Sequence, residues 1–191
     1  MKTERKILKL FIEDKKPKTI REISKEISAD YRITHTAVKR LISKKIILTN
    51  KIGKSLSCEL NFNYSGIEIY EAENERKENL LKNKDIKQLF REVISKIKPS
   101  FFIFLIFGSY AKNRQAKSSD IDMIFISNDK NFEEKFLGIF SLIPIKTHAL
   151  VFTEEEFIRM KDSKKPNVVK EAIENNIILY GAENYYKLKN A

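Results

Sequence analysis

Four residues in the middle of the sequence combine a tight turn with paired acids. Gly108 and Ser109 directly follow the apolar segment FFIFLIF at 101–107, and ten residues separate Ser109 from Asp120. A strand that runs through Gly-Ser into a helix presents free backbone N–H groups, which bind phosphate. Asp120 and Asp122 are two positions apart, so on a strand their carboxylates point to one face, an arrangement that suits Mg²⁺. The pattern predicts a site for a nucleoside triphosphate and magnesium.

The segments around this pattern alternate between strands and helices. FFIFLIF is apolar on both faces, which predicts a central strand covered by helices on both sides. The other expected elements are a helix over 85–98, a strand over 120–127, a helix over 131–142, a strand over 143–152, helices that begin near 153 and 166, and an edge strand over 177–181. The helix near 153 is expected to begin with a capping pattern of Thr153 and Glu156. Pro166 is expected in the first turn of its helix. The predicted fold class is α/β, or α+β, with a mixed sheet flanked by helices.

Phe-Gly-Ser, ten intervening residues and Asp-Ile-Asp resemble the signature of the nucleotidyltransferase superfamily with the polymerase-beta-type fold. The sequence is most similar to the small, minimal members, and the similarity covers about residues 85–186. It rests on the spacing of the motif, on Ser119 before the first aspartate, and on the apolar strands on either side. The segment IILYGAENYY at 177–186 is also similar to the C-terminal end of these domains.

The resemblance implies a role for each residue of the motif. Asp120 and Asp122 would be catalytic and would bind two magnesium ions. The nucleotide-binding residues would be Gly108, Ser109, Lys112, Arg114 and Ser119, with Lys117 as a further cation near the triphosphate. Lys112, Arg114 and Lys117 could also simply form a solvated loop. A hydroxyl or phosphate of an acceptor would attack the α-phosphorus in line and release pyrophosphate, while the metals reduce the cost of charge on the transferred group.

The sequence departs from the family at the third carboxylate, which active members carry on a later strand. The matching segment, 143–152, contains no Asp or Glu, and none occurs between Glu134 and Glu154. His148 lies about where the carboxylate is expected. Its imidazole could act as a catalytic base, but it is a poor magnesium ligand, and it could also be a partly buried strand residue. Catalysis therefore stays an open question at this point.

The first sixty residues predict a different kind of module. Apolar residues at helical spacing predict three helices, and Thr19 with Glu22 predicts a capping box at the start of the second. The segments 46–50 and 55–61 predict a β-hairpin whose second strand alternates, with Leu56, Cys58 and Leu60 on one side. This order resembles a winged helix-turn-helix over residues 3–61. The expected DNA-binding residues are His35, Thr36, Lys39, Arg40 and Lys44 on the third helix, and Lys51 and Lys54 on the wing. The same residues could form a plain polar face, and winged helices can also pair with proteins.

The charge distribution favours nucleic acid as the partner of the N-terminal part. Residues 1–60 hold 16 Lys and Arg against 7 Asp and Glu, whereas the rest of the chain holds 21 against 19. A basic module beside a nearly neutral one is typical of polyanion binding. No apolar run exceeds seven residues, which predicts no membrane span and no signal peptide. The single cysteine, Cys58, is expected at a buried strand position and fits a reducing, cytoplasmic location.

The sequence thus predicts three regions: a winged helix-turn-helix at 1–62, a helical connector at 63–84 without a buried face, and a nucleotidyltransferase-fold domain at 85–191. The leading functional hypothesis is a magnesium-dependent transferase that binds a nucleoside triphosphate and DNA. The alternative is a winged-helix transcription regulator whose inactive transferase domain senses nucleotide or forms a homodimer. An antitoxin-like role, in which a minimal transferase modifies a toxin, is a third hypothesis.

Overall fold

The computed structural model describes residues 2–53, 55–97, 101–116, 119–140 and 146–191. Two units divide the chain, Met1–Glu73 and Asn74–Ala191. The boundary falls inside helix α4 (Ile67–Leu80), within the predicted connector at 63–84. Each unit has its own sheet and its own core, so each is described by itself.

Unit 1 packs three helices against a small antiparallel sheet with strand order β1-β3-β2. Its elements are α1 (Lys2–Glu13), β1 (Lys18–Thr19), α2 (Ile20–Glu26), α3 (Tyr31–Ser43), β2 (Ile47–Ile52) and β3 (Ser55–Leu60). The predicted apolar face of the first helix is buried, with Ile7 and Phe11 fully enclosed. The predicted capping box of α2 is confirmed, because Thr19 and Glu22 each accept a hydrogen bond from the other's backbone N–H.

Burial along β3 departs from simple alternation at two positions. The sequence places Leu56, Cys58 and Leu60 on one side of the strand, and Cys58 and Leu60 are buried, but Leu56 is exposed and Ser57 is buried. The short strand β1 contributes to the burial of Ser57, because Thr19 pairs with Ser57 in the ladder. Cys58 is buried as expected, and this burial raises the pKa of its thiol to about 11, as expected of a structural cysteine.

Helix α4 corrects the prediction of a connector without a buried face. Ile69, Ala72, Glu73 and Arg76 are all buried. Two of these residues are charged, so their inward positions could not be recognised from hydrophobic spacing. The Arg76 guanidinium donates a hydrogen bond through Nη2 to the backbone oxygen of Asn176, at 2.7 Å, inside unit 2.

Unit 2 is a mixed α/β unit whose four-stranded sheet has the order β6-β5-β4-β7. After α4 its elements are α5 (Lys84–Lys96), β4 (Ile103–Phe107), α6 (Gly108–Ala111), β5 (Ile121–Ile126), α7 (Phe132–Phe140), β6 (Thr147–Phe152), α8 (Glu154–Asp162), α9 (Val168–Glu174), β7 (Asn176–Tyr180) and α10 (Ala182–Asn190). Strands β5 and β6 are parallel, whereas β4 is antiparallel to both of its neighbours. The sheet is therefore mixed, as the sequence predicts.

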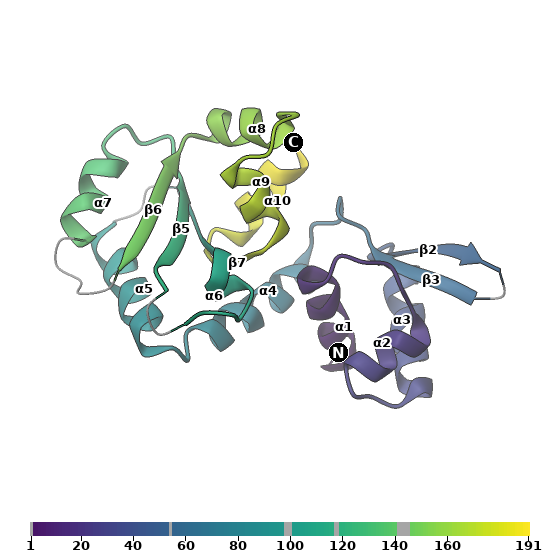
Figure 1. Cartoon of the computed structure of the whole chain (residues 1–191). Helices are drawn as coiled ribbons and strands as arrows, with labels where there is room; N and C mark the ends of the chain where they lie inside the picture. The colour runs from purple at the N-terminus through teal and green to yellow at the C-terminus, as the bar shows by residue number, and fades with distance from the viewer. Residues whose placement is uncertain (1, 54, 98–100, 117–118, 141–145) are drawn as a thin grey trace. The chain divides into compact units, whose positions relative to one another are not determined.

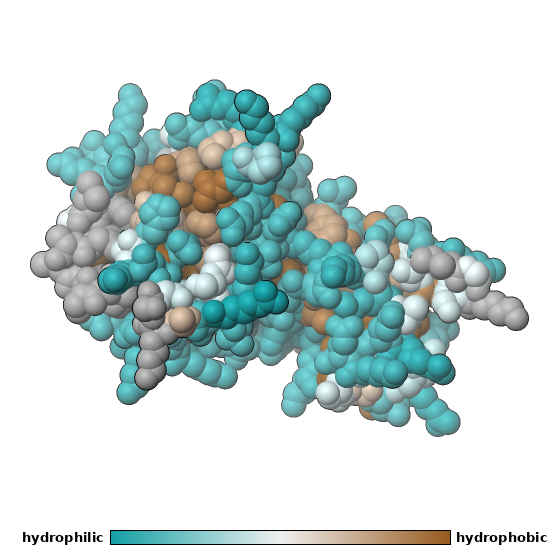
Figure 2. All heavy atoms as spheres, in the orientation of Figure 1, coloured by the Kyte–Doolittle hydropathy of each residue, from teal (hydrophilic) through white to brown (hydrophobic). Residues whose placement is uncertain are grey.

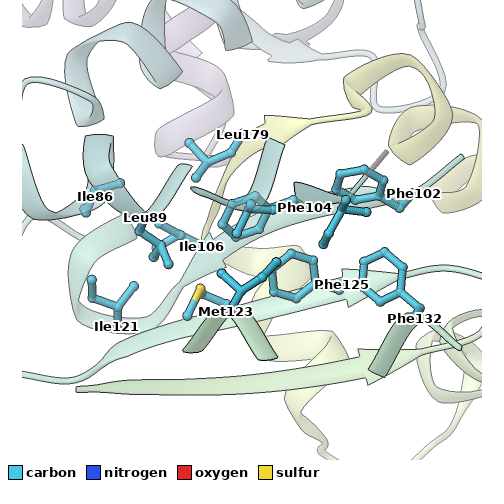
Figure 3. Close-up of a cluster of buried hydrophobic side chains, with 13 residues drawn as sticks. Ile86, Leu89, Phe102, Phe104, Ile106, Ile121, Met123, Phe125, Phe132 and Leu179 are labelled. Atoms are coloured by element: carbon cyan, nitrogen blue, oxygen red, sulfur yellow. The ribbon is translucent and has the colours of Figure 1, made fainter. Parts of the chain in front are cut away.

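Strand β4 lies inside the sheet, and all five of its residues are buried. Figure 3 shows one face of the sheet, where Phe104 and Met123 meet Ile86 and Leu89 of α5. Figure 1 shows α5 and α7 on one side of the sheet and α8, α9 and α10 on the other. Strand β4 ends at Phe107, and the chain turns there into α6, whose first residue, Gly108, is also buried.

The C-terminal elements agree with the sequence except at one proline. Thr153 and Glu156 form the predicted capping box of α8, and β7 is the predicted edge strand. Pro166 precedes Asn167, the N-cap of α9, so it lies before the first turn and not within it. Figure 2 shows a mostly hydrophilic surface with an apolar area on unit 2. Among the described helices, none has the length and hydropathy needed to span a bilayer.

Candidate functional site

Gly108 occupies a backbone position that other residues would strain. Its φ is +68°, in the left-handed region that favours glycine. The site also lacks room, because a Cβ atom at Gly108 would collide with the carboxylate of Asp122 and lie 3.2 Å from its Cγ. The pairing of Ile106 with Met123 explains this closeness, since it brings the end of β4 beside the start of β5. The structure thus brings the glycine turn and one acid of the motif into contact.

The segment after Gly108 forms the short helix that the sequence predicts. The backbone N–H of Lys112 donates to Gly108 O at 3.2 Å, and that of Arg114 donates to Ser109 O at 2.9 Å. Asn113 ends the helix with a φ of +51°, a conformation that asparagine tolerates. Ser109 is half-buried at the first turn, next to the end of the apolar strand.

Asp122 and His148 lie side by side on neighbouring parallel strands. They are register partners of β5 and β6, and His148 Nδ1 is 3.6 Å from Asp122 Oδ1. The His148 side chain is 61% exposed and that of Asp122 is 32% exposed, so both are open to a ligand. Asp120 is exposed directly before β5, two positions from Asp122. The parallel register therefore places Asp122 and His148 on one face of the sheet, and Asp120 lies just outside β5.

The predicted phosphate-binding side chains do not all lie free. Lys112 Nζ is 3.4 Å from Glu171 Oε1 of α9, in an exposed ion pair. Ser119 accepts a hydrogen bond from the backbone N–H of Ala116 at 2.9 Å through its hydroxyl, and so it closes the loop before Asp120. Arg114 is exposed. Lys117 lies outside the described residues.

In the part of the chain that the structure describes, the two aspartates do not belong to a larger acidic cluster. Among the described residues, no group of three or more His, Cys, Asp or Glu is arranged to hold a metal ion. Glu156 is engaged in its capping box, where the Thr153 backbone N–H holds the pKa of the carboxyl below its usual value. The backbone N–H of Glu154 donates to the Asn128 side chain, so this cluster of acids begins α8.

The comparison with protein families agrees with this geometry. The family model described as Polymerase beta, Nucleotidyltransferase matches residues 84–185. The chain belongs to this family. No curated protein and no solved structure matches the chain at a significant level.

The match covers the whole α/β part of the nucleotidyltransferase domain, from the start of α5 into α10. It includes Gly108, both aspartates and His148, and it lies entirely within unit 2. Membership supports nucleotidyl transfer as the general chemistry of this domain. Unit 1 lies outside the matched residues.

The residues predicted to bind DNA lie on α3, just after it, and on β2. Lys39 and Lys51 are exposed, His35 is half-buried, and Thr36 Oγ donates to Arg32 O at 3.0 Å. Two cations are in ion pairs: Arg40 Nη1 is 3.5 Å from Glu4 Oε1, and Lys44 Nζ is 2.8 Å from Glu68 Oε1. Lys54 lies outside the described residues.

The sequence gives no sign of two features of this surface. Ile33 is 56% exposed on α3, and it lines a hollow of about 340 Å³ together with Glu4, Arg32 and Arg40. Glu68 accepts hydrogen bonds from Lys44 and Tyr64, which lower the pKa of its carboxyl to about 2. Both features depend on residues from separate segments of the chain, which helical periodicity within one segment does not connect.

Proposed function

We propose that residues 85–191 bind a nucleoside triphosphate with magnesium and transfer its nucleotidyl group to an acceptor. The contact between Gly108 and the Asp122 carboxylate is the observation that supports this proposal most strongly. A phosphate on the glycine turn would lie next to that carboxylate, and two adjacent anions require a cation between them. Family membership supports the same chemistry.

The donor set around the turn suits magnesium. Asp120 and Asp122 are exposed or half-exposed, and both supply hard carboxylate oxygens. They would hold the metal, with phosphate oxygens and water completing its coordination. When bound, magnesium would neutralise charge on the triphosphate and on the transferred group. Gly108 and Ser109 would present backbone N–H groups and a hydroxyl to the phosphates.

In the transfer step, an acceptor oxygen attacks the α-phosphorus and the bond to the β-phosphate oxygen breaks. Pyrophosphate leaves with that oxygen, and an acceptor hydroxyl gives up its proton. His148 is the group of this chain that would take the proton. Because His148 Nδ1 faces Asp122, Nε2 is the nitrogen that would accept it. This step needs no third carboxylate on β6.

Unit 1 is proposed to be a winged-helix DNA-binding module. Its element order, α1-β1-α2-α3-β2-β3, and its sheet order, β1-β3-β2, support this assignment. Helix α3 would enter the major groove, and the hairpin of β2 and β3 would be the wing. Exposed Lys39 and Lys51 would contact phosphates.

Transfer of label from labelled nucleoside triphosphates tests the enzyme directly. The wild type and the variant Asp120→Ala/Asp122→Ala are incubated with magnesium and with DNA, RNA and protein acceptors. We expect a labelled product with the wild type alone. Equal labelling by both proteins would contradict the assignment of the two acids.

One observation favours a second function without catalysis: in the described part of the chain, no group of three or more His, Cys, Asp or Glu is arranged to hold a metal ion. In this alternative, unit 1 regulates transcription and the transferase fold senses nucleotide without transferring it. Binding of nucleotide without labelled product, together with specific DNA binding that weakens steeply with salt, would distinguish it from the enzyme.

A further inference from the structure

Arg76 is a charged residue whose side chain is almost entirely removed from solvent. It is 5% exposed, and its Nη2 donates to the backbone oxygen of Asn176 at 2.7 Å. Burial of a guanidinium costs free energy unless its donors are used, and the group stays protonated. A buried charge of this kind fixes its acceptor firmly, because breaking the bond leaves that charge with fewer partners.

The acceptor of this bond is a residue that several helices hold in place. Asn176 begins β7 and is 8% exposed. Its side-chain amide donates to Ala172 O of α9 at 2.6 Å and to Tyr185 Oη of α10 at 2.8 Å. The backbone oxygen is held by Arg76 of α4. Three helices therefore determine the position of the first residue of β7.

Asn176 is in turn connected to the glycine turn. It pairs with Phe107 in the β4–β7 ladder, and Phe107 immediately precedes Gly108. A shift of Asn176 would move the end of β4. The positive φ of Gly108 and its contact with Asp122 leave little tolerance for such a shift.

We infer that Arg76 is a positioning residue for triphosphate binding, which holds the Gly108–Ser109 turn in its binding geometry through Asn176 and β4. The inference rests on the proposed nucleotide site and extends it to a helix outside the motif. Arg76 is not proposed to contact the ligand. Its effect is on the backbone N–H groups that receive the phosphates.

Calorimetric titration of the full chain with inorganic triphosphate and Mg²⁺ tests this inference, at a temperature where every variant is folded by circular dichroism. The variants are Arg76→Met, Arg76→Lys and the matched control Arg91→Met, which removes an exposed arginine of α5. Arg76→Met removes the hydrogen bond from the charged guanidinium to Asn176, which in the proposal holds the Gly108–Ser109 turn. We therefore expect about tenfold weaker triphosphate binding for Arg76→Met. Arg76→Lys keeps a donor and should fall between Arg76→Met and the wild type, and Arg91→Met should match the wild type.

Hydrogen exchange gives a second readout, because we expect faster exchange of the Ser109 amide in both Arg76 variants. A purely structural role would lower the melting temperature but leave the affinity of the folded protein unchanged. Wild-type affinity in folded Arg76→Met would overturn the inference and leave the nucleotide site standing. If Arg76→Met does not fold, wild-type affinity and exchange in Arg76→Lys would overturn it. No binding by the wild type would refute both the site and the inference.

Discussion

Two surfaces of the molecule are built in different ways. One is the glycine turn of unit 2, at Gly108 and Ser109, and the other is the basic face of unit 1, formed by Lys39, Arg40 and Lys44 on and just after α3. The turn depends on the backbone of Gly108, on a contact with Asp122, and on strands whose residues are buried. The basic face consists of long side chains at the surface, and two of them, Arg40 and Lys44, lie in ion pairs. A site fixed by backbone should fail when one atom is added, whereas a site of surface charges should weaken in small steps.

The largest effect is expected from Gly108→Ala. The added methyl group collides with the Asp122 carboxylate, and holding alanine in the left-handed conformation costs about 1–2 kcal/mol more. We expect loss of detectable triphosphate binding in calorimetry and a lower free energy of unfolding.

The matched control is Gly138→Ala in α7, where an added Cβ would meet no atom within 4 Å. Alanine in a helix should raise the stability by roughly 0.5–1 kcal/mol and leave binding intact. Equal binding by both alanine variants would show that the turn does not need glycine.

The next effect concerns the stability of unit 1 at acidic pH, and it tests whether Glu68 is engaged with Lys44 and Tyr64 in solution. Hydrogen bonds from Lys44 and Tyr64 lower the pKa of Glu68 from 4.5 to about 2. The resulting stabilisation is present above pH 4.5 and is lost as the pH falls towards 2. Thermal unfolding should therefore show a steeper loss of stability over this range in the wild type than in Glu68→Gln. Identical pH profiles would show that Glu68 is not engaged in solution.

A smaller, graded effect is expected from the DNA-binding lysines. Lys39→Ala should weaken binding to all DNA sequences similarly and reduce the salt slope by about one. Lys170→Ala removes a lysine from the side of α9 in the other unit and should leave the salt slope unchanged. Fluorescence anisotropy at several salt concentrations measures both. A slope that Lys39→Ala leaves unchanged would remove α3 from the interface.

The smallest effect is expected at Lys112, where the pair with Glu171 is exposed. Glu171→Gln would free Lys112 and remove a negative charge near the proposed triphosphate. Exposed pairs contribute only about 0.2–1 kcal/mol, so triphosphate affinity should rise by no more than about fivefold. Weaker binding in calorimetry would show that Glu171 assists the ligand and does not compete for Lys112.

The sequence predicts well those features that depend on local periodicity. The buried faces of α1 and α5, the enclosed strand β4 and both Thr-Glu capping boxes follow from spacing within one segment. The closeness of Gly108 and Asp122 is consistent with the motif, since the motif spans two adjacent strands.

Features that connect distant segments could not be predicted in this way. Arg76 and Asn176 are 100 positions apart, and Lys112 and Glu171 are 59 apart. The two-residue strand β1 is too short to show alternation, so its pairing with Ser57 cannot be predicted from the sequence pattern. Buried Glu73 and Arg76 made α4 resemble a solvated connector, because charge usually marks the surface.

The most direct test of the nucleotide site is calorimetry of the wild type with ATP, CTP, GTP and UTP, with and without magnesium, beside Asp120→Ala/Asp122→Ala. We expect the wild type to bind at least one triphosphate in a magnesium-dependent manner and the double variant, although folded, not to bind. Binding that is absent in the wild type, or equal in the two proteins, would contradict it.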